Sequence, residues 1–350
     1  MELYLRAREH PEAALIFNGL IAHASMFVIE SHRCLTNLVP ETKEAFTSNH
    51  SELLRESRHC AKLLDNSEKS IEEVIADLGT IAKRQRAIFL EPHKGFLGPL
   101  KRVIQPDTGL SIYDEHIFTT THSVVFAFGK EDEFSESAFA FGKEIGGYIA
   151  TVFKLFKIEI PTVAEKPANL PGIIGMRDIK YEALYNRSHL DANQIAFSAG
   201  LLLILANLNF VIYILPGLLP VDSHLLFRMK FITAFHANSG IKSLQDRIRD
   251  KSTLEATVNF FKEALGNKDS RWLRKQKRLR NLLTHYVADE QLINKLKPDL
   301  TRLEAIEYCA GGLSFHEINE LLDRNIVHLA TLLEKFYKLD GDPFWLGKVR

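Results

Sequence analysis

An arginine and a histidine five positions apart, Arg280 and His285, are the residues of this sequence best suited to catalysis. Histidine can take up or release a proton near neutral pH, so it can serve as a general acid or base. Arginine stays protonated and can bind a phosphate group with two donors at once. Asn281, which follows the arginine, could orient the imidazole or hold a phosphate oxygen. These residue types suit acid–base chemistry on a phosphate ester.

A strongly basic run leads into this pair. Asp269 is the single acidic residue between 268 and 280. Cations at this density can neutralise a phosphate backbone, and the ring of Trp272 could stack on a base. A solvated helix face with Trp272 in the core would show the same pattern, and that alternative stays open. The candidate nucleic-acid contacts are Arg271, Arg274, Lys275, Lys277 and Arg278.

Both catalytic candidates fall on one predicted helix, 270–287. Its apolar stripe faces a core and consists of Leu279, Leu282, Leu283 and Tyr286. At about 100° per residue, Arg280 and His285 point about 140° apart. One regular helix therefore does not direct both side chains at one phosphate. We expect either a distortion near Arg280 or a cleft that two chains share.

The segment RNLLTH, from Arg280 to His285, resembles the R-x(4–6)-H signature of HEPN domains, in which Asn is a frequent residue after the Arg. The resemblance covers about 180–340. It implies a helical domain that cleaves RNA without a metal ion, with His285 as general acid or base, Arg280 as phosphate stabiliser and Asn281 as orienting group. Such domains usually pair two motifs across a symmetric homodimer, and many act as toxins or antiphage effectors.

In such a reaction the RNA's own 2′-hydroxyl attacks the adjacent phosphate, and the products are a 2′,3′-cyclic phosphate and a 5′-hydroxyl. No cofactor and no metal are expected. The expected partners are RNA, a second copy of the chain, and a regulatory protein or antitoxin. A membrane is not among them.

Other constellations are weaker. Arg324, Asn325 and His328 have a similar composition, but the spacing is one residue short. Arg324 and His328 are four positions apart on a predicted helix, so we expect a surface pair. The potential zinc ligands His32, Cys34, His59 and Cys60 do not have the spacing of a compact zinc site. The sequence contains neither a P-loop nor a dinucleotide-binding glycine pattern.

The hydrophobic spacing predicts a mainly α fold, in which a C-terminal antiparallel helical bundle (HEPN-like) follows a mostly helical N-terminal region with minor strands. In the N-terminal region we expect helices over 13–38, 41–64, 70–89 and 135–158. Prolines and glycines predict loops between 91 and 110. Residues 118–128 are rich in β-branched and aromatic types, which favour one or two strands.

Three prolines, Pro161, Pro167 and Pro171, mark residues 161–177 as a linker. The expected organisation is an N-terminal region of unknown role (1–160), this linker, and a HEPN-like bundle (178–340). Ser314 and Glu317 form a capping-box pattern at the start of the last helix. The bundle helices are expected at 178–188, 191–215, 222–249, 252–265, 270–287 and 314–338.

The composition is that of a globular protein. The chain of 350 residues balances 44 basic against 44 acidic residues, so any basic surface is local. Three cysteines suit a reducing compartment, and charged residues precede any apolar run at the N-terminus, which is unlike a signal peptide. We therefore expect a cytoplasmic protein. The uncharged segment 195–215 is long enough to cross a bilayer, but its polar residues favour a buried helix.

Three functions follow from these patterns. The leading hypothesis is a metal-independent endoribonuclease of HEPN type. The second is a non-catalytic helical interaction or regulatory protein, in which the Arg–His motif is structural. The third is a membrane-anchored regulator that uses 195–215.

Overall fold

The structure is a computed structural model, and it places most of the chain. The predicted helices over 41–64 and 70–89 lie almost entirely outside the described residues. The described residues are 2–40, 106–121, 123–124, 134–159, 168–180, 195–248, 255–286 and 301–339, together with Leu54, Arg55, Ser57, Arg58, Glu73, Ala76, Gly79, Thr80, Ala183, Leu184, Arg187 and Ser188.

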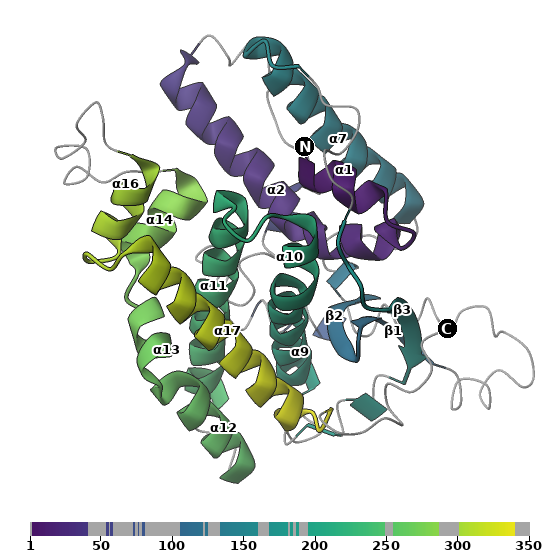
Figure 1. Ribbon diagram of the computed structural model, residues 1–350. Helices are drawn as coiled ribbons and strands as arrows, with labels where there is room; N and C mark the ends of the chain where they lie inside the picture. Colours follow the sequence, from purple (N-terminus) through teal and green to yellow (C-terminus); the bar gives the residue numbers. More distant parts are fainter. Residues whose placement is uncertain are drawn as a thin grey trace, which may run out of the picture.

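Helices make up most of the described chain, and one small sheet lies beside α9 at the edge of the fold (Figure 1). The prediction of a mainly α fold with minor strands is confirmed. The N-terminal helices are α1 (Glu2–Arg8), α2 (Ala13–Leu38) and α7 (Phe134–Leu155). The C-terminal helices are α9 (Ile195–Asn209), the π-helical segment η3 (Phe210–Ile214), α10 (Leu215–Leu218), α11 (His224–Ile248), α12 (Glu255–Gly266), α13 (Lys268–Leu273), α14 (Lys277–His285), α16 (Arg302–Cys309) and α17 (Phe315–Phe336).

The sheet is antiparallel and has the order β2-β1-β3. Its strands are β1 (Thr108–Tyr113), β2 (His116–Thr120) and β3 (Ile174–Ile179). The sequence predicts β2 in part but places loops up to residue 110, although the central strand β1 already begins at Thr108. Every residue of β1 is buried. Strand β3 begins inside the predicted linker 161–177, so the end of that segment belongs to the sheet.

One hydrophobic core joins the two predicted regions. Helix α2, the sheet and the C-terminal helices all contribute buried side chains to a single cluster. At its centre lies the apolar segment 195–218, which continues as α9, η3 and α10 without a break. Asn209, fully buried where α9 ends, donates to the Ile117 carbonyl at 3.1 Å and to Glu334 at 3.2 Å. The packing therefore shows no separation between 1–160 and 178–340 among the described residues.

Two helices are long and apolar enough to cross a membrane by length and composition, Ala13–Leu38 and Phe197–Leu218. In the folded chain, 61% of the most apolar 18-residue stretch of the first helix and 72% of that of the second are buried inside the structure. The core helix of a folded domain meets the same criteria, so these two helices are weak evidence for a membrane span.

The C-terminal helices pack in more than one relative direction. Helices α11 and α14 are antiparallel, because Arg228 contacts the end of α14 while Phe235 contacts Arg280 near its start. Helices α11 and α17 instead run in the same direction. The Phe227 ring packs on Phe315 near the start of both helices, and Asn238 bonds to Asn325 further along both. The bundle is thus only partly antiparallel (Figure 1).

The predicted helix 270–287 is two helices. Helix α13 ends at Leu273, and α14 begins at Lys277 after a short turn. Helix α16 was not predicted. The predicted capping box at Ser314 and Glu317 is confirmed, and both of its reciprocal bonds are present at the start of α17.

A close contact between α2 and η3 depends on a glycine. A Cβ atom added at Gly19 would lie 2.4 Å from ring carbons of Phe210, a side chain that is itself buried. Neither the packed ring nor the helix backbone can retreat easily, because both are in the core. Only glycine allows α2 to lie this close.

We predict that Gly19→Ala destabilises the protein by about 1–3 kcal/mol through overpacking, although alanine is the better helix former. Gly146 is the matched control, because it lies in helix α7 with open space around it. There the same substitution should stabilise by up to about 1 kcal/mol. Urea denaturation of the two variants measures both effects, and equal shifts would contradict the close contact.

Candidate functional site

His285 is the last residue of α14. The next residue, Tyr286, adopts a left-handed conformation with φ 54°, and its N–H donates to the carbonyl of Asn281. This ends the helix immediately after the histidine. No further helical turn covers the imidazole, and 21% of the His285 side chain is exposed.

Arg280 and His285 meet within one chain. Nη1 of Arg280 lies 3.0 Å from Nε2 of His285. The angle of about 140° between their Cα–Cβ directions is a correct property of the helix but does not decide the contact, because the arginine side chain is long enough to curve around the last turn. The helix is continuous from Lys277 to His285, so neither the expected distortion nor a second chain is needed to bring the pair together.

The second ring nitrogen of His285 is held by a residue that the sequence does not predict. Nδ1 of His285 lies 2.8 Å from Oε2 of Glu30, on helix α2. The Glu30 side chain is completely buried, and Arg58 pairs with its other carboxylate oxygen. The N-terminal region thus supplies part of the site.

The hydrogen bonds assign the tautomer of His285. Arginine can only donate, so Nε2 accepts from Arg280. Nδ1 then carries the proton and donates to the Glu30 carboxylate. The arrangement is a neutral imidazole between a fixed carboxylate and a fixed guanidinium, and the carboxylate would stabilise the imidazolium that forms when Nε2 takes a proton.

The charge of Glu30 is maintained by its neighbours. Burial alone would raise the pKa of this carboxyl group. The hydrogen bond from His285 and the positive charge of Arg58, with a smaller contribution from the charge of Arg33, outweigh burial and lower the pKa below its ordinary value. Glu30 is therefore ionised throughout the neutral range.

Arg228, on α11, fastens the end of α14. Its Nε donates to the carbonyl of Leu283 at 2.6 Å, and its guanidinium also donates to the hydroxyl of Tyr286. The same group lies over the Tyr286 ring, 4.5 Å from the centroid. A cation at the C-terminal end of a helix donates to carbonyl groups that have no partner within the helix, and it interacts favourably with the negative end of the helix dipole. Arg228 thereby fixes the turn that carries His285.

A buried histidine lies near this clamp. Both ring nitrogens of His23, on α2, lack a hydrogen-bond partner. Burial, followed by the charges of Arg228 and His236, lowers the pKa of His23 to about 4. His236, one residue after Phe235, is buried as well. His23 is therefore a neutral core side chain at physiological pH.

The sequence predicts that Asn281 orients the imidazole of His285, but the structure does not place it there. Its side chain is exposed, and the nitrogens of His285 bond to Arg280 and Glu30 instead. The orienting role that the sequence gives to Asn281 is thus filled by Glu30. Asn281 remains available to a bound phosphate.

The basic run divides into two groups. Arg274 donates to the carbonyl of Leu265 at 3.1 Å, and burial, with the charge of Arg271, lowers its pKa. It fastens the end of α12 rather than forming a free surface cation, so the expectation of an RNA contact at Arg274 is not supported. Trp272 is half-buried against the core. The exposed members are Arg271, Lys275, Lys277 and Arg278.

Arg278 lies over the ring of Tyr308, on α16, at 5.1 Å from the centroid. This contact leaves the side chain exposed but limits its direction. The exposed cations occupy α13, the turn after it, and α14, which is the helix that carries Arg280 and His285. The expected basic surface is therefore continuous in sequence with the candidate site.

One signal in the sequence could have identified Glu30. It is the only acidic residue between Ala13 and Leu38, in a helix that is otherwise largely apolar. A lone carboxylate on a buried helix requires a cationic or hydrogen-bonding partner. What the sequence does not contain is the identity of that partner, because His285 lies 255 positions away.

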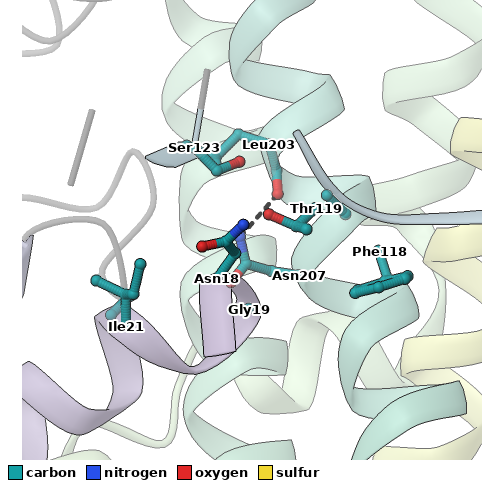
Figure 2. A pocket seen from close by; sticks show the side chains of 10 residues that line it. Asn18, Gly19, Ile21, Phe118, Thr119, Ser123, Leu203 and Asn207 are labelled. Atoms are coloured by element: carbon teal, nitrogen blue, oxygen red, sulfur yellow. Dashed lines mark hydrogen bonds between the residues drawn. The ribbon is translucent and has the colours of Figure 1, made fainter. Parts of the chain in front are cut away.

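A small cavity elsewhere is not the site (Figure 2). Its volume is about 20 Å³, and its lining includes Asn18, Thr119 and Asn207 but neither Arg280 nor His285. Asn207 turns its amide to the carbonyl of Leu203 at 2.9 Å. A space of this size holds about one water molecule. The candidate site is instead an arrangement on the surface, where a polymer could reach it.

Comparison with known protein families, with curated proteins and with solved structures finds no match for this chain. The function is therefore inferred from the residues and their geometry.

We predict that Glu30→Gln destabilises the protein by about 3 kcal/mol, because it leaves Arg58 buried without its counter-charge. Urea denaturation at neutral pH measures the loss. The wild-type contribution is complete above the ordinary glutamate pKa and is lost as pH falls through the lowered pKa of Glu30. Glu9→Gln, at an exposed position, is the control and should change stability by less than about 0.5 kcal/mol. Equal effects at the two positions would contradict the buried ion pair.

The low pKa of His23 predicts that the stability of the protein depends on pH. Its pKa rises from about 4 to 6.5 on unfolding, so the unfolded chain binds a proton that the folded chain excludes. This contribution is complete above pH 6.5 and is lost as pH falls toward 4, by about 2 kcal/mol between pH 7.5 and pH 5. His23→Leu should remove that part of the slope, whereas His316→Ala, with 82% of its side chain exposed, should retain it. Parallel profiles for wild type and His23→Leu would refute the assignment.

Proposed function

We propose that this protein is a metal-independent endoribonuclease of HEPN type. The main support is the contact of Arg280 with Nε2 of His285, with Nδ1 of the same ring held by the buried carboxylate of Glu30. A purely structural motif would not require a carboxylate–imidazole–guanidinium series with a partly exposed ring. These are the groups that a phosphate ester needs for proton transfer and charge stabilisation.

Arg280 has two roles in this proposal. In the free protein it donates to Nε2 of His285 and occupies the nitrogen that would act as base. A phosphodiester oxygen is the stronger acceptor for a guanidinium, because the bond is charge-assisted on both sides. Binding of RNA would therefore draw Arg280 onto the phosphate and release Nε2 for the 2′-hydroxyl.

The reaction then follows from the positions of these groups. Nε2 of His285 takes the proton of the 2′-hydroxyl, and the 2′-oxygen attacks the adjacent phosphorus. Arg280 stabilises the charge that develops on the phosphate oxygens. The bond from phosphorus to the 5′-oxygen breaks, which leaves a 2′,3′-cyclic phosphate and, after protonation, a 5′-hydroxyl. Glu30 stabilises the imidazolium and keeps the ring in one tautomer.

A homodimer remains part of the proposal for a different reason than the one the sequence suggests. One chain can bring Arg280 and His285 together, so the partner is not needed to complete the pair. The leaving 5′-oxygen does need a proton donor, and the imidazole that has just acted as base lies on the side of the 2′-oxygen. A two-fold pair of sites would provide a second His285 for that step.

The wider setting is proposed on less direct grounds. The exposed residues Arg271, Lys275, Lys277 and Arg278 would hold the RNA backbone. A role as toxin or antiphage effector and control by a regulatory protein or antitoxin follow from the resemblance to HEPN domains. A cytoplasmic location follows from the three cysteines, which suit a reducing compartment. The N-terminal region would take part in the site itself through Glu30, beyond any role in sensing or regulation.

The alternative is a helical interaction protein in which the same residues hold α14 against α2. Glu30, Arg58 and Arg228 fit that alternative too, because each fastens one element to another. Arg280 distinguishes the two functions, because its side chain is partly exposed and its guanidinium contacts the rings of His285 and Phe235 rather than the buried Glu30 carboxylate.

We predict that the wild-type protein cleaves single-stranded RNA in the presence of EDTA. His285→Ala and Arg280→Ala should each lower the rate by at least about 100-fold, because each removes one catalytic group. The products should carry 2′,3′-cyclic phosphate and 5′-hydroxyl ends, and an RNA with 2′-deoxyribose at the cleaved position should stay intact. Gel analysis and mass spectrometry of the fragments provide the measurement.

His316→Ala is the control, because this histidine is exposed on α17 and lies outside the site. It should cleave at the wild-type rate. A circular dichroism melt of each variant shows whether it remains folded. RNA left equally intact by folded wild type and by His285→Ala would favour the interaction protein, and cleavage that stops in EDTA would contradict the metal-independent reaction.

A further inference from the structure

A second group of polar and basic residues lines a hollow of about 270 Å³ between the start of α13 and the middle of α17. Arg324, Asn325 and His328, which resemble the catalytic motif in composition, all take part in it. Arg324 does not pair with His328 as expected from the sequence, but with Asp269 at 3.2 Å. The complete lining is Asn267, Lys268, Asp269, Arg324, Asn325 and His328.

The floor of the hollow is rigid. Asn325 is 1% exposed, accepts from Asn238 at 2.8 Å and donates to Ser270 at 2.9 Å. Ser270 is itself buried and donates to the Ala264 carbonyl at 2.7 Å. The amide of Asn325 is thus committed on both sides. Its role is to hold α17 against α13.

The walls carry an excess of donors. Lys268 is exposed at the start of α13, and Arg324 is exposed on α17. His328 lies one helical turn after Arg324, and its Nε2 is buried without a hydrogen-bond partner. A buried ring nitrogen with no partner is costly and is satisfied when a ligand oxygen approaches. Asp269 is the one carboxylate in the lining, and its charge is already engaged by Arg324.

We propose, on the basis of the ribonuclease function proposed above, that this hollow binds a backbone phosphate of the RNA at a distance from the cleaved bond. Lys268 and Arg324 supply the positive charge, and the Nε2–H tautomer of His328 supplies a directed donor. The chemistry recognised is a phosphate group, and the source assigned to it is the RNA strand rather than a free nucleotide.

The position of the hollow favours RNA as that source. Lys268 begins the basic run that continues through α13 and α14 to Arg280. A strand held at the exposed cations of this run can therefore reach both the hollow and the catalytic pair. The hollow is open to solvent, and every residue in its lining is of a polar or charged type, whereas a site for a free nucleotide would also need an aromatic or aliphatic surface for the base. A phosphate site in this hollow would lengthen the RNA-binding surface, so the affinity would depend on the length of the RNA strand.

The first measurement is RNA binding in the His285→Ala background, where cleavage does not interfere. Fluorescence anisotropy with a single-stranded RNA of about 15 nucleotides gives the dissociation constant at several salt concentrations. Arg324→Ala and Lys268→Ala should each weaken binding several-fold and lower the slope of log K against log salt by about 0.7, the value for one phosphate contact on a single strand. Lys335→Ala is the matched control on α17 and should change neither quantity, because its side chain is exposed outside the hollow.

Asp269→Asn provides a test with the opposite sign. It removes the carboxylate that engages Arg324, so RNA affinity should increase. A misfolded variant would lose affinity, and a gain therefore cannot result from damage to the fold.

Cleavage separates this proposal from the proposed function. In the otherwise wild-type protein, Arg324→Ala should slow cleavage of the long RNA at low concentration more than cleavage of a dinucleotide, because the single phosphodiester of a dinucleotide is the one that must lie at the catalytic pair. If no RNA is cleaved at all but the binding effects are present, the ribonuclease function fails and the phosphate site stands.

Two results would overturn the phosphate site. One is equal RNA affinity in Arg324→Ala, Lys268→Ala, Asp269→Asn and the parent protein. The other is binding of inorganic phosphate or adenosine monophosphate that depends on Arg324 while RNA binding does not, because the hollow would then take a small ligand and not the strand.

Discussion

The structure depends on one buried carboxylate. Glu30 lies in an apolar helix with no exposed surface, and an ion in that position is tolerated only if cations and donors surround it. Arg58 and His285 meet that requirement from two distant parts of the chain. Removing any one of the three would leave a desolvated charge or an unpaired donor. The packing of α2 against α14 is therefore specified by polar chemistry, in a contact that apolar side chains alone could make in several ways.

The same interaction unites the molecule and prepares the site. Glu30 fixes one nitrogen of His285, and Arg228, on α11, fixes the turn that carries this histidine. Arg280 is then the only member of the arrangement that can move without exposing a buried charge. An imidazole held by a buried carboxylate, next to a guanidinium held by that imidazole, suits a site in which the substrate must displace a resting contact. The structural residues and the catalytic candidates are thus neighbours but have different freedom.

Local patterns in the sequence predicted much of the fold. Helix α2 and the capping box of α17 follow from hydrophobic spacing and from Ser314 with Glu317, because these signals act within a few residues. Strands β1 and β3 were missed, since each is stabilised by pairing with a segment more than 60 positions away and lies among prolines and glycines. For the candidate site, the residue types singled out Arg280 and His285, and the structure brings these two side chains into contact. The angle between Arg280 and His285 on the helix wrongly predicted that they point apart, because it describes the Cα–Cβ directions and not the reach of a long side chain. Glu30 could not be predicted from a short motif, because it lies 255 positions from His285.

The distance along the chain between Glu30 and His285 has a consequence for synthesis. A ribosome makes the carboxylate early and the imidazole only after most of the protein has emerged. Until then no partial product holds both halves of the arrangement, whatever helices it has already formed. If the protein cleaves RNA as proposed, this order would keep the incomplete polypeptide harmless to the message and the ribosome that are producing it.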